Sequence, residues 1–195
     1  MRRITASLAV CLWAIQCGFV TIDAQHHTTH VHGKAQLEMV ATSDTLQIQV
    51  TIPAESTVGF EYAPKNQAET EKVENVKSML TTDGLFTFLS SGRFLKRPSA
   101  LQLSPLMHHI EYTYDHPKSS PHAGHDHTAH SMHAAFKLTR TYSRKTLASI
   151  THISTQLFSF FPDITQIELT IVSDDTIAYS TLTPQESQLK LPHRL

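Results

Sequence analysis

The chain has 195 residues, enough for one domain with a proper core. Its formal net charge of −1 excludes the strongly basic character of a protein that binds nucleic acid or an acidic membrane surface. Fourteen histidines make the charge depend on pH, whereas the two cysteines, Cys11 and Cys17, both lie near the amino terminus. A metal site elsewhere in the chain must therefore use imidazole and carboxylate groups.

The first 24 residues have the pattern of a secretory signal peptide. Arg2 and Arg3 precede an apolar run, and Ala24 ends a plausible cleavage site. A transmembrane anchor is the alternative, but the apolar run is short and no charged stop follows it. We expect export, cleavage after residue 24, no stable membrane anchor, and a mature domain of residues 25–195 without cysteine.

Four histidines open the predicted mature chain: His26, His27, His30 and His32. The last two begin an alternating segment that continues to Met39. Residues i and i+2 of a strand share a face, so the rings of His30 and His32 are expected side by side and able to chelate a metal. Two exposed strand histidines without a metal role are the alternative, which the imidazoles just upstream make less favourable.

The next segments predict a hairpin, a loop and a helix. Residues 46–52 alternate strictly and predict a second strand that pairs with the first. The loop over residues 54–64 carries Glu61, and residues 67–80 place apolar side chains at helical spacing beside a charged face. Short strands are predicted over residues 85–89 and 100–103.

A stronger strand is predicted from Leu106 to Asp115, and it carries three candidate ligands. His108 falls on one face of this strand, while His109 and Glu111 fall on the other. The second pair could chelate a metal, although a lone strand histidine is more often structural.

The segment from His116 to His133 is the most distinctive part of the chain. Five of its last twelve residues are histidine, and imidazole with carboxylate suits zinc, copper or nickel. Glycine and proline leave the backbone soft, so we expect a flexible metal-binding insert rather than a plain polar linker. Such ligands load near neutral pH and empty in acid. The candidate ligands are His116, His122, His125, Asp126, His127, His130 and His133.

The alternation of apolar and polar residues that is typical of a strand resumes after the insert. Residues 134–142 alternate as a strand, and Ser143 is a candidate N-cap for a second main helix that runs through Phe161. A final hairpin is predicted over residues 164–172 and 176–182. The order predicts an α+β fold of antiparallel hairpins with two main helices, interrupted by the flexible insert. Each half holds strands and one helix, which raises the alternative of two related halves.

Enzyme motifs are missing from the sequence. There is no GxSxG motif, no glycine-rich phosphate loop and no HExxH helix. Catalytic zinc usually has three rigidly held ligands and one open position, whereas many histidines on a soft loop suit capture and release. Ligand chemistry does not select zinc by itself, because copper binds such sites more tightly. A metal-dependent enzyme and a copper or nickel sequestration protein remain alternatives.

Several motifs are shared with one known family. Residues 30–37 read HVHGKAQL, residues 58–64 read VGFEYAP, and Phe160-Phe161-Pro162 precedes the final hairpin. With the His-rich insert, these motifs resemble the ZrgA-like periplasmic zinc-binding proteins over nearly all of residues 26–192.

The resemblance implies zinc binding in the periplasm of a Gram-negative bacterium, in support of a zinc transport system of the cell envelope and without known catalysis. It also implies that histidines of the folded core hold zinc, in addition to the insert. His30 and His32 match the HxHG motif, and Glu61 matches the acid of GFE. This chain has Tyr62 where the family usually has histidine, and its mature part lacks the cysteine pair that many members carry.

Overall fold

Strands dominate the computed structural model, which describes residues 32–90, 99–101, 103–114, 134–147 and 150–191. The larger of two sheets contains β1 (Lys34–Ala41), β2 (Thr45–Pro53), β5 (Met107–Tyr114), β6 (Ala134–Ser143), β8 (Gln166–Ser173) and β9 (Thr176–Leu182). The smaller sheet contains β3 (Phe86–Ser90), β4 (Ser99–Leu101), β7 (Ile150–Thr155) and β10 (Gln188–Lys190). The helices are α1 (Glu55–Val58), α2 (Gln67–Thr81), α3 (Arg144–Leu147) and α4 (Leu157–Phe160), with a short 3₁₀ helix, η1 (Asp83–Leu85).

The strand order of the larger sheet is β5-β6-β2-β1-β8-β9, and that of the smaller sheet is β10-β7-β3-β4. β1 and β2 form the predicted antiparallel hairpin, with Leu37 opposite Val50. On its other side β1 pairs with β8 in parallel, with Lys34 opposite Gln166. This parallel pair joins segments far apart in the sequence, and no local sequence pattern predicted it.

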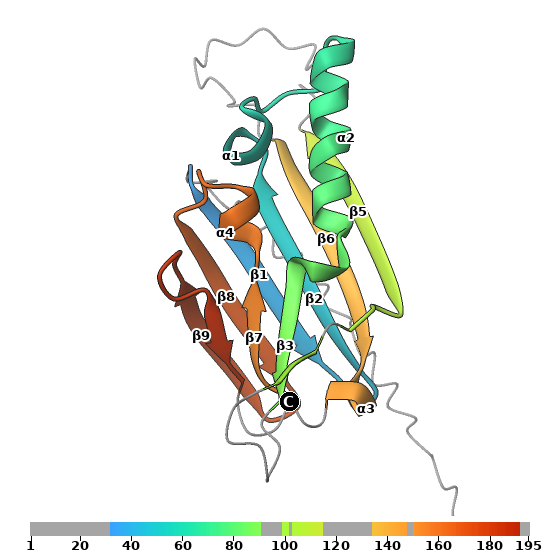
Figure 1. Ribbon diagram of the computed structural model, residues 1–195, viewed down its shortest axis with the longest axis vertical. Helices are drawn as coiled ribbons and strands as arrows, with labels where there is room; N and C mark the ends of the chain where they lie inside the picture. Colours follow the sequence, from blue (N-terminus) through green and yellow to red (C-terminus); the bar gives the residue numbers. More distant parts are fainter. Residues whose placement is uncertain (1–31, 91–98, 102, 115–133, 148–149, 192–195) are drawn as a thin grey trace, which may run out of the picture.

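The core lies on one face of the larger sheet. Alternate residues of β1, β2 and β6 point into it, which is the period-two pattern expected of half-buried strands. Helix α2 and the smaller sheet cover this face, α2 toward one end and β3 with β7 toward the other (Figure 1). The helix contributes Val73, Val76 and Leu80, and the smaller sheet contributes Phe86, Phe88 and Ile153.

The predicted α+β fold with two main helices is wrong, because the described residues form ten strands in two sheets and one long helix. Helix α2 confirms the first predicted helix. The predicted second helix, from Ser143 to Phe161, is instead divided among α3, β7 and α4. Both sheets mix strands that precede and follow residues 116–133, so the two parts of the chain do not form separate units. The alternative of two related halves stays a prediction.

A β-bulge explains the error over the second helix. Between Leu89 and Ser90 of β3 the register with β7 shifts, so that Ser90 faces Ile150 while Leu89 faces His152. The extra residue on β7 brings Ile150 and Ile153 into the core and so mimics the three-residue spacing of a helix. The β-branched residues of this segment, including the two isoleucines, fit a strand better than a helix.

Two predictions fall outside the described residues. These are the signal peptide over residues 1–24 and the His-rich insert over residues 116–133. Within the described residues, no helix combines the length and apolar character needed to cross a membrane.

Candidate metal centre

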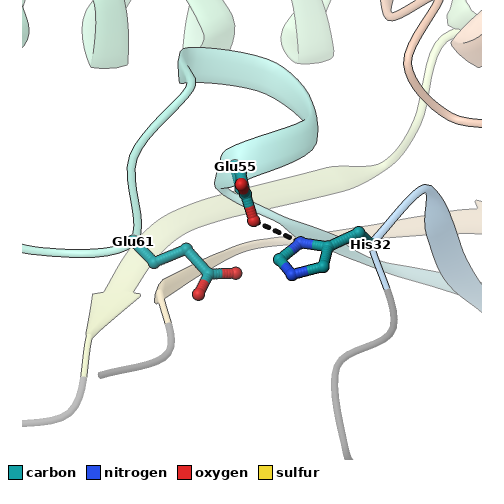
Figure 2. Close-up of side chains that lie close together, drawn as sticks. All are labelled: His32, Glu55 and Glu61. Carbon is teal, nitrogen blue, oxygen red and sulfur yellow. Dashed lines mark ion pairs between the residues drawn. The ribbon is translucent and has the colours of Figure 1, made fainter. Parts of the chain in front are cut away.

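The turn before β1 and the segment around α1 meet at one end of the larger sheet. Antiparallel pairing puts the start of β1 beside the end of β2, so His32, just before β1, lies near Glu55, the first residue of α1. The backbone N–H of Ala54 donates a 2.9 Å hydrogen bond to the carbonyl of Ala134, which holds the start of α1 against β6. Glu61 follows α1, and its carboxylate turns back toward the other two side chains (Figure 2).

His32, Glu55 and Glu61 form a compact group of potential ligands. The imidazole Nδ1 of His32 makes an ion pair with Glu55, and one ligand atom from each of the three residues lies within 4.8 Å of the others. Zinc bonds of about 2.0–2.2 Å would bring tetrahedral ligands to roughly 3.3–3.6 Å from one another, so small side-chain rotations would close this group around an ion. Within the described residues, it is the one group of three His, Cys, Asp or Glu side chains that could hold a metal.

The group lies at the surface. The side chain of His32 is 71% exposed and that of Glu55 is 47% exposed, while Glu61 is half-buried. An ion held there would stay in contact with water, and its ligands could exchange. One imidazole and two carboxylates match the nitrogen and oxygen ligands that zinc uses in proteins.

Gly33 allows the chain beside His32 to pass close to the loop before β8. Its φ of +76° lies in the left-handed region, and a Cβ atom there would lie 3.1 Å from the backbone oxygen of Asp163 and from Oγ1 of Thr165. Its carbonyl accepts a 2.8 Å hydrogen bond from the backbone N–H of Thr165. Its own N–H donates to Oγ of Ser56 at 3.2 Å. The residue after His32 is therefore held both to β8 and to α1.

A cleft of about 320 Å³ adjoins the group, and most of the residues that line it have polar side chains. Asp163 and Thr165 contribute one wall, and the segments that carry His32 and Glu55 contribute the other. The cleft gives an ion or its carrier access to the ligands from solvent. Its lining residues are His32, Gly33, Glu55, Ser56, Asp163 and Thr165.

His109 and Glu111 lie on one face of β5, as predicted. Nε2 of His109 is 4.0 Å from Oε2 of Glu111, and their side chains are 71% and 46% exposed. Across the strand they face Thr139 and Lys137. In the part of the chain that the structure describes, no third ligand joins them. Their metal role stays a prediction, and so does that of His108, which is exposed at the neighbouring position of β5.

The remaining predicted ligands lie outside the described residues. Their part in a metal site therefore stays a prediction. They are His26, His27 and His30 at the amino terminus, and His116, His122, His125, Asp126, His127, His130 and His133 of the insert.

Glu55 was not among the ligands predicted from the sequence. A single acidic residue in a predicted loop has no periodic pattern to distinguish it from solvated charge. The available signal was Gly59, which lies between Glu55 and Glu61 and ends α1 with a φ of +82°. A glycine at such a position indicates a sharp reversal, and the reversal brings the two carboxylates to the same side.

The fold and this group of ligands together define a β-rich protein with a candidate site for a divalent metal ion. The chain belongs to the ZrgA family of zinc uptake proteins, which it matches over residues 29–191. No curated protein matches the sequence. The match confirms the resemblance seen in the sequence, and it includes all three residues of the candidate site. A zinc uptake family indicates a zinc-related, extracytoplasmic role, and its description names no enzymatic activity.

Proposed function

We propose that this protein binds zinc in the periplasm and supports zinc acquisition by holding the ion for transfer, or by buffering it, without catalysis. The recipient is a zinc transport system of the cell envelope. The observation that carries this proposal is the convergence of His32, Glu55 and Glu61 in a member of a zinc uptake family.

The exposure of the ligands supports a carrier rather than an enzyme. Active sites commonly exclude water, which strengthens the electrostatic interactions that stabilise a transition state. Here the His32 side chain is 71% exposed, and an ion beside the open cleft remains accessible to competing ligands. Such a site favours exchange of the ion with a partner.

Residues 1–24 supply the export signal in this proposal, and the mature protein begins near Gln25. Support comes from the basic start, the apolar run and Ala24. The intact mass of protein recovered from the periplasm tests it. Retention of Met1 to Ala24 in that protein would contradict it.

The His-rich insert, residues 116–133, is proposed as a capture region of weaker affinity. Its flanking residues Tyr114 and Ala134 pair with each other across β5 and β6, and Ala134 accepts the hydrogen bond from Ala54, the neighbour of Glu55. In this proposal the insert joins strand ends that lie next to the folded site, and zinc passes between the two regions within one molecule. Binding in the insert must order polar backbone at a cost of ~1–2 kcal/mol per residue. The sheet already places His32, so we expect tighter binding there.

Zinc titration of the mature protein, by competition with a chromophoric chelator, tests the two regions. The triple variant His32→Ala, Glu55→Gln, Glu61→Gln should lose the tightest site and keep weaker, multiple binding. Deletion of residues 116–133 should lose most of the capacity and keep the tightest site. His30→Ala should weaken that site if His30 is a further ligand, as the HxHG motif implies.

The matched control is the variant His109→Ala, Glu111→Gln. This pair has nearly the same exposure as His32 and Glu55 but lacks a third ligand among the described residues. Replacing His109 and Glu111 should abolish at most one weak zinc site. If the triple variant binds zinc as tightly as the wild type, or the control variant loses the tightest site, then His32, Glu55 and Glu61 do not form the tightest site. Elemental analysis of periplasmic protein decides between zinc and copper or nickel.

A further inference from the structure

The segment that carries Glu61 is held by side chains from other parts of the molecule. It connects α1 to α2 over residues 59–66. Glu61 must come within bonding distance of an ion already contacted by His32 and Glu55, so freedom in this segment would weaken binding. The contacts that restrain it therefore bear on the affinity of the site.

Tyr112 of β5 makes one such contact. Its hydroxyl group donates a 2.7 Å hydrogen bond to the backbone carbonyl of Tyr62, the residue after Glu61. The Tyr112 ring is fixed in turn, because it packs against Phe136 with centroids 4.8 Å apart and against Tyr114 at 5.9 Å. A tyrosine on a regular strand thus holds the backbone carbonyl of the residue that follows a candidate ligand.

The side chain of Tyr62 fixes the other side of the segment. Its ring stacks on Phe60 with centroids 5.0 Å apart, and Nζ of Lys65 lies 4.0 Å from the ring centroid. Its hydroxyl group lies 3.5 Å from Oε1 of Glu69, and Oε2 of Glu69 accepts a 2.7 Å hydrogen bond from the N–H of Lys65. Tyr62 therefore anchors the segment to the first turn of α2, while Tyr112 holds its backbone.

We infer that Tyr112 is a positioning residue for zinc binding, acting through Glu61. The inference rests on the proposed function of the site. Groups that orient metal ligands by hydrogen bonds typically change metal affinity by about 10–100-fold when they are removed. The Tyr112 contact acts on Glu61 through the backbone of Tyr62, so we expect a change at the lower end of that range. A restrained Glu61 loses less freedom when the ion binds, which favours association.

The test is a double-mutant cycle in the full mature protein, read as the zinc dissociation constant of the tightest site. Tyr112→Phe removes the hydroxyl group and keeps the ring that packs on Phe136. It should weaken zinc binding about tenfold, while the melting temperature of the zinc-free protein should fall by only a few degrees, as the loss of one hydrogen bond implies. In a Glu61→Gln background the same change should have almost no further effect. Tyr179→Phe is the matched control, because Tyr179 is 78% exposed on β9, and it should bind zinc like the wild type.

The outcomes separate this inference from the proposed function. If Glu61→Gln weakens binding but Tyr112→Phe does not, the positioning role is wrong and the site stands. If Tyr112→Phe weakens binding equally in both backgrounds, Tyr112 does not act through Glu61, and the inference is overturned. If Glu61→Gln binds zinc like the wild type, the proposed site itself is wrong.

Discussion

The backbone N–H of Gly33 donates a 3.2 Å hydrogen bond to the hydroxyl group of Ser56, and this bond joins the neighbours of two candidate ligands. Gly33 follows His32, and Ser56 follows Glu55. Ser56 is 6% exposed, so the bond is sheltered from water. It links the turn before β1 directly to α1 and thereby fixes the spacing between the imidazole and the first carboxylate.

Replacing this hydroxyl group should therefore affect both stability and binding. Ser56→Ala leaves the Gly33 N–H without its partner, and we expect a loss of ~1 kcal/mol in the free energy of unfolding. Zinc affinity should fall by about tenfold, as for other groups that orient ligands. Urea unfolding and zinc titration measure the two effects. Ser180→Ala, at an exposed position of β9, should change neither.

Among the described residues, Gly33 and Gly59 have a positive φ, and they allow a matched comparison. Both Gly33→Ala and Gly59→Ala place a side chain in the left-handed region, at a cost of about 1–2 kcal/mol. At Gly59 the new Cβ meets nothing within 4 Å, whereas at Gly33 it meets the backbone oxygen of Asp163 at 3.1 Å. Thermal unfolding should show the greater loss for Gly33→Ala. Equal losses would mean that the contact between Gly33 and the loop before β8 is not tight.

Arg140 offers a separate test of the core. It is 1% exposed, and its Nη2 atom donates 2.8 Å hydrogen bonds to the carbonyls of Leu80 and Thr82 at the end of α2. Arg140→Ala should lower the free energy of unfolding by ~3 kcal/mol, through a cavity and two carbonyls without partners. Arg140→Met keeps most of the volume and should lose less. Both variants should keep wild-type zinc affinity at temperatures where they are folded. Arg140 lies toward the other end of β6 from Ala134, the residue that contacts the start of α1 beside the candidate site.

The pKa of Tyr112 predicts an effect of alkaline pH. Burial, and then the charges of Tyr62 and Glu61, raise the pKa of Tyr112 from 10.0 to about 12. The folded state therefore favours the neutral phenol. The contribution of this shift to stability is complete below pH 10 and is lost as the pH rises to about 12. Unfolding followed over this range should show a steeper loss for the wild type than for Tyr112→Phe. Parallel curves would contradict the shift.

Local patterns predicted most of the individual elements. Strict alternation revealed the β1–β2 hairpin and the β8–β9 hairpin, and helical spacing revealed α2. The same reasoning failed at β7, because the bulge opposite β3 gives Ile150 and Ile153 a spacing that also occurs in helices. The short strand β10 was missed as well, since three residues are too few to show a period.

The candidate site could be predicted only in part. The HxHG and GFE motifs pointed to His32 and Glu61, which the structure brings together. Glu55 and Asp163 carry no such motif. Their proximity to His32 depends on the end of β2 and on the pairing of β1 with β8, and contacts between such distant segments leave no local trace in the sequence.

The parallel pairing of β1 with β8 also has a consequence for how the molecule matures. His32 lies near the start of the described chain. The carbonyl of its neighbour Gly33 nevertheless accepts a hydrogen bond from the N–H of Thr165, which is in the last fifth of the sequence. Contacts at such separation form late, after the intervening chain has collapsed. A polypeptide that is synthesised from its amino terminus thus exposes this histidine long before the strand that secures it has been made. Stable coordination by His32, Glu55 and Glu61 would therefore mark a chain that is both complete and folded.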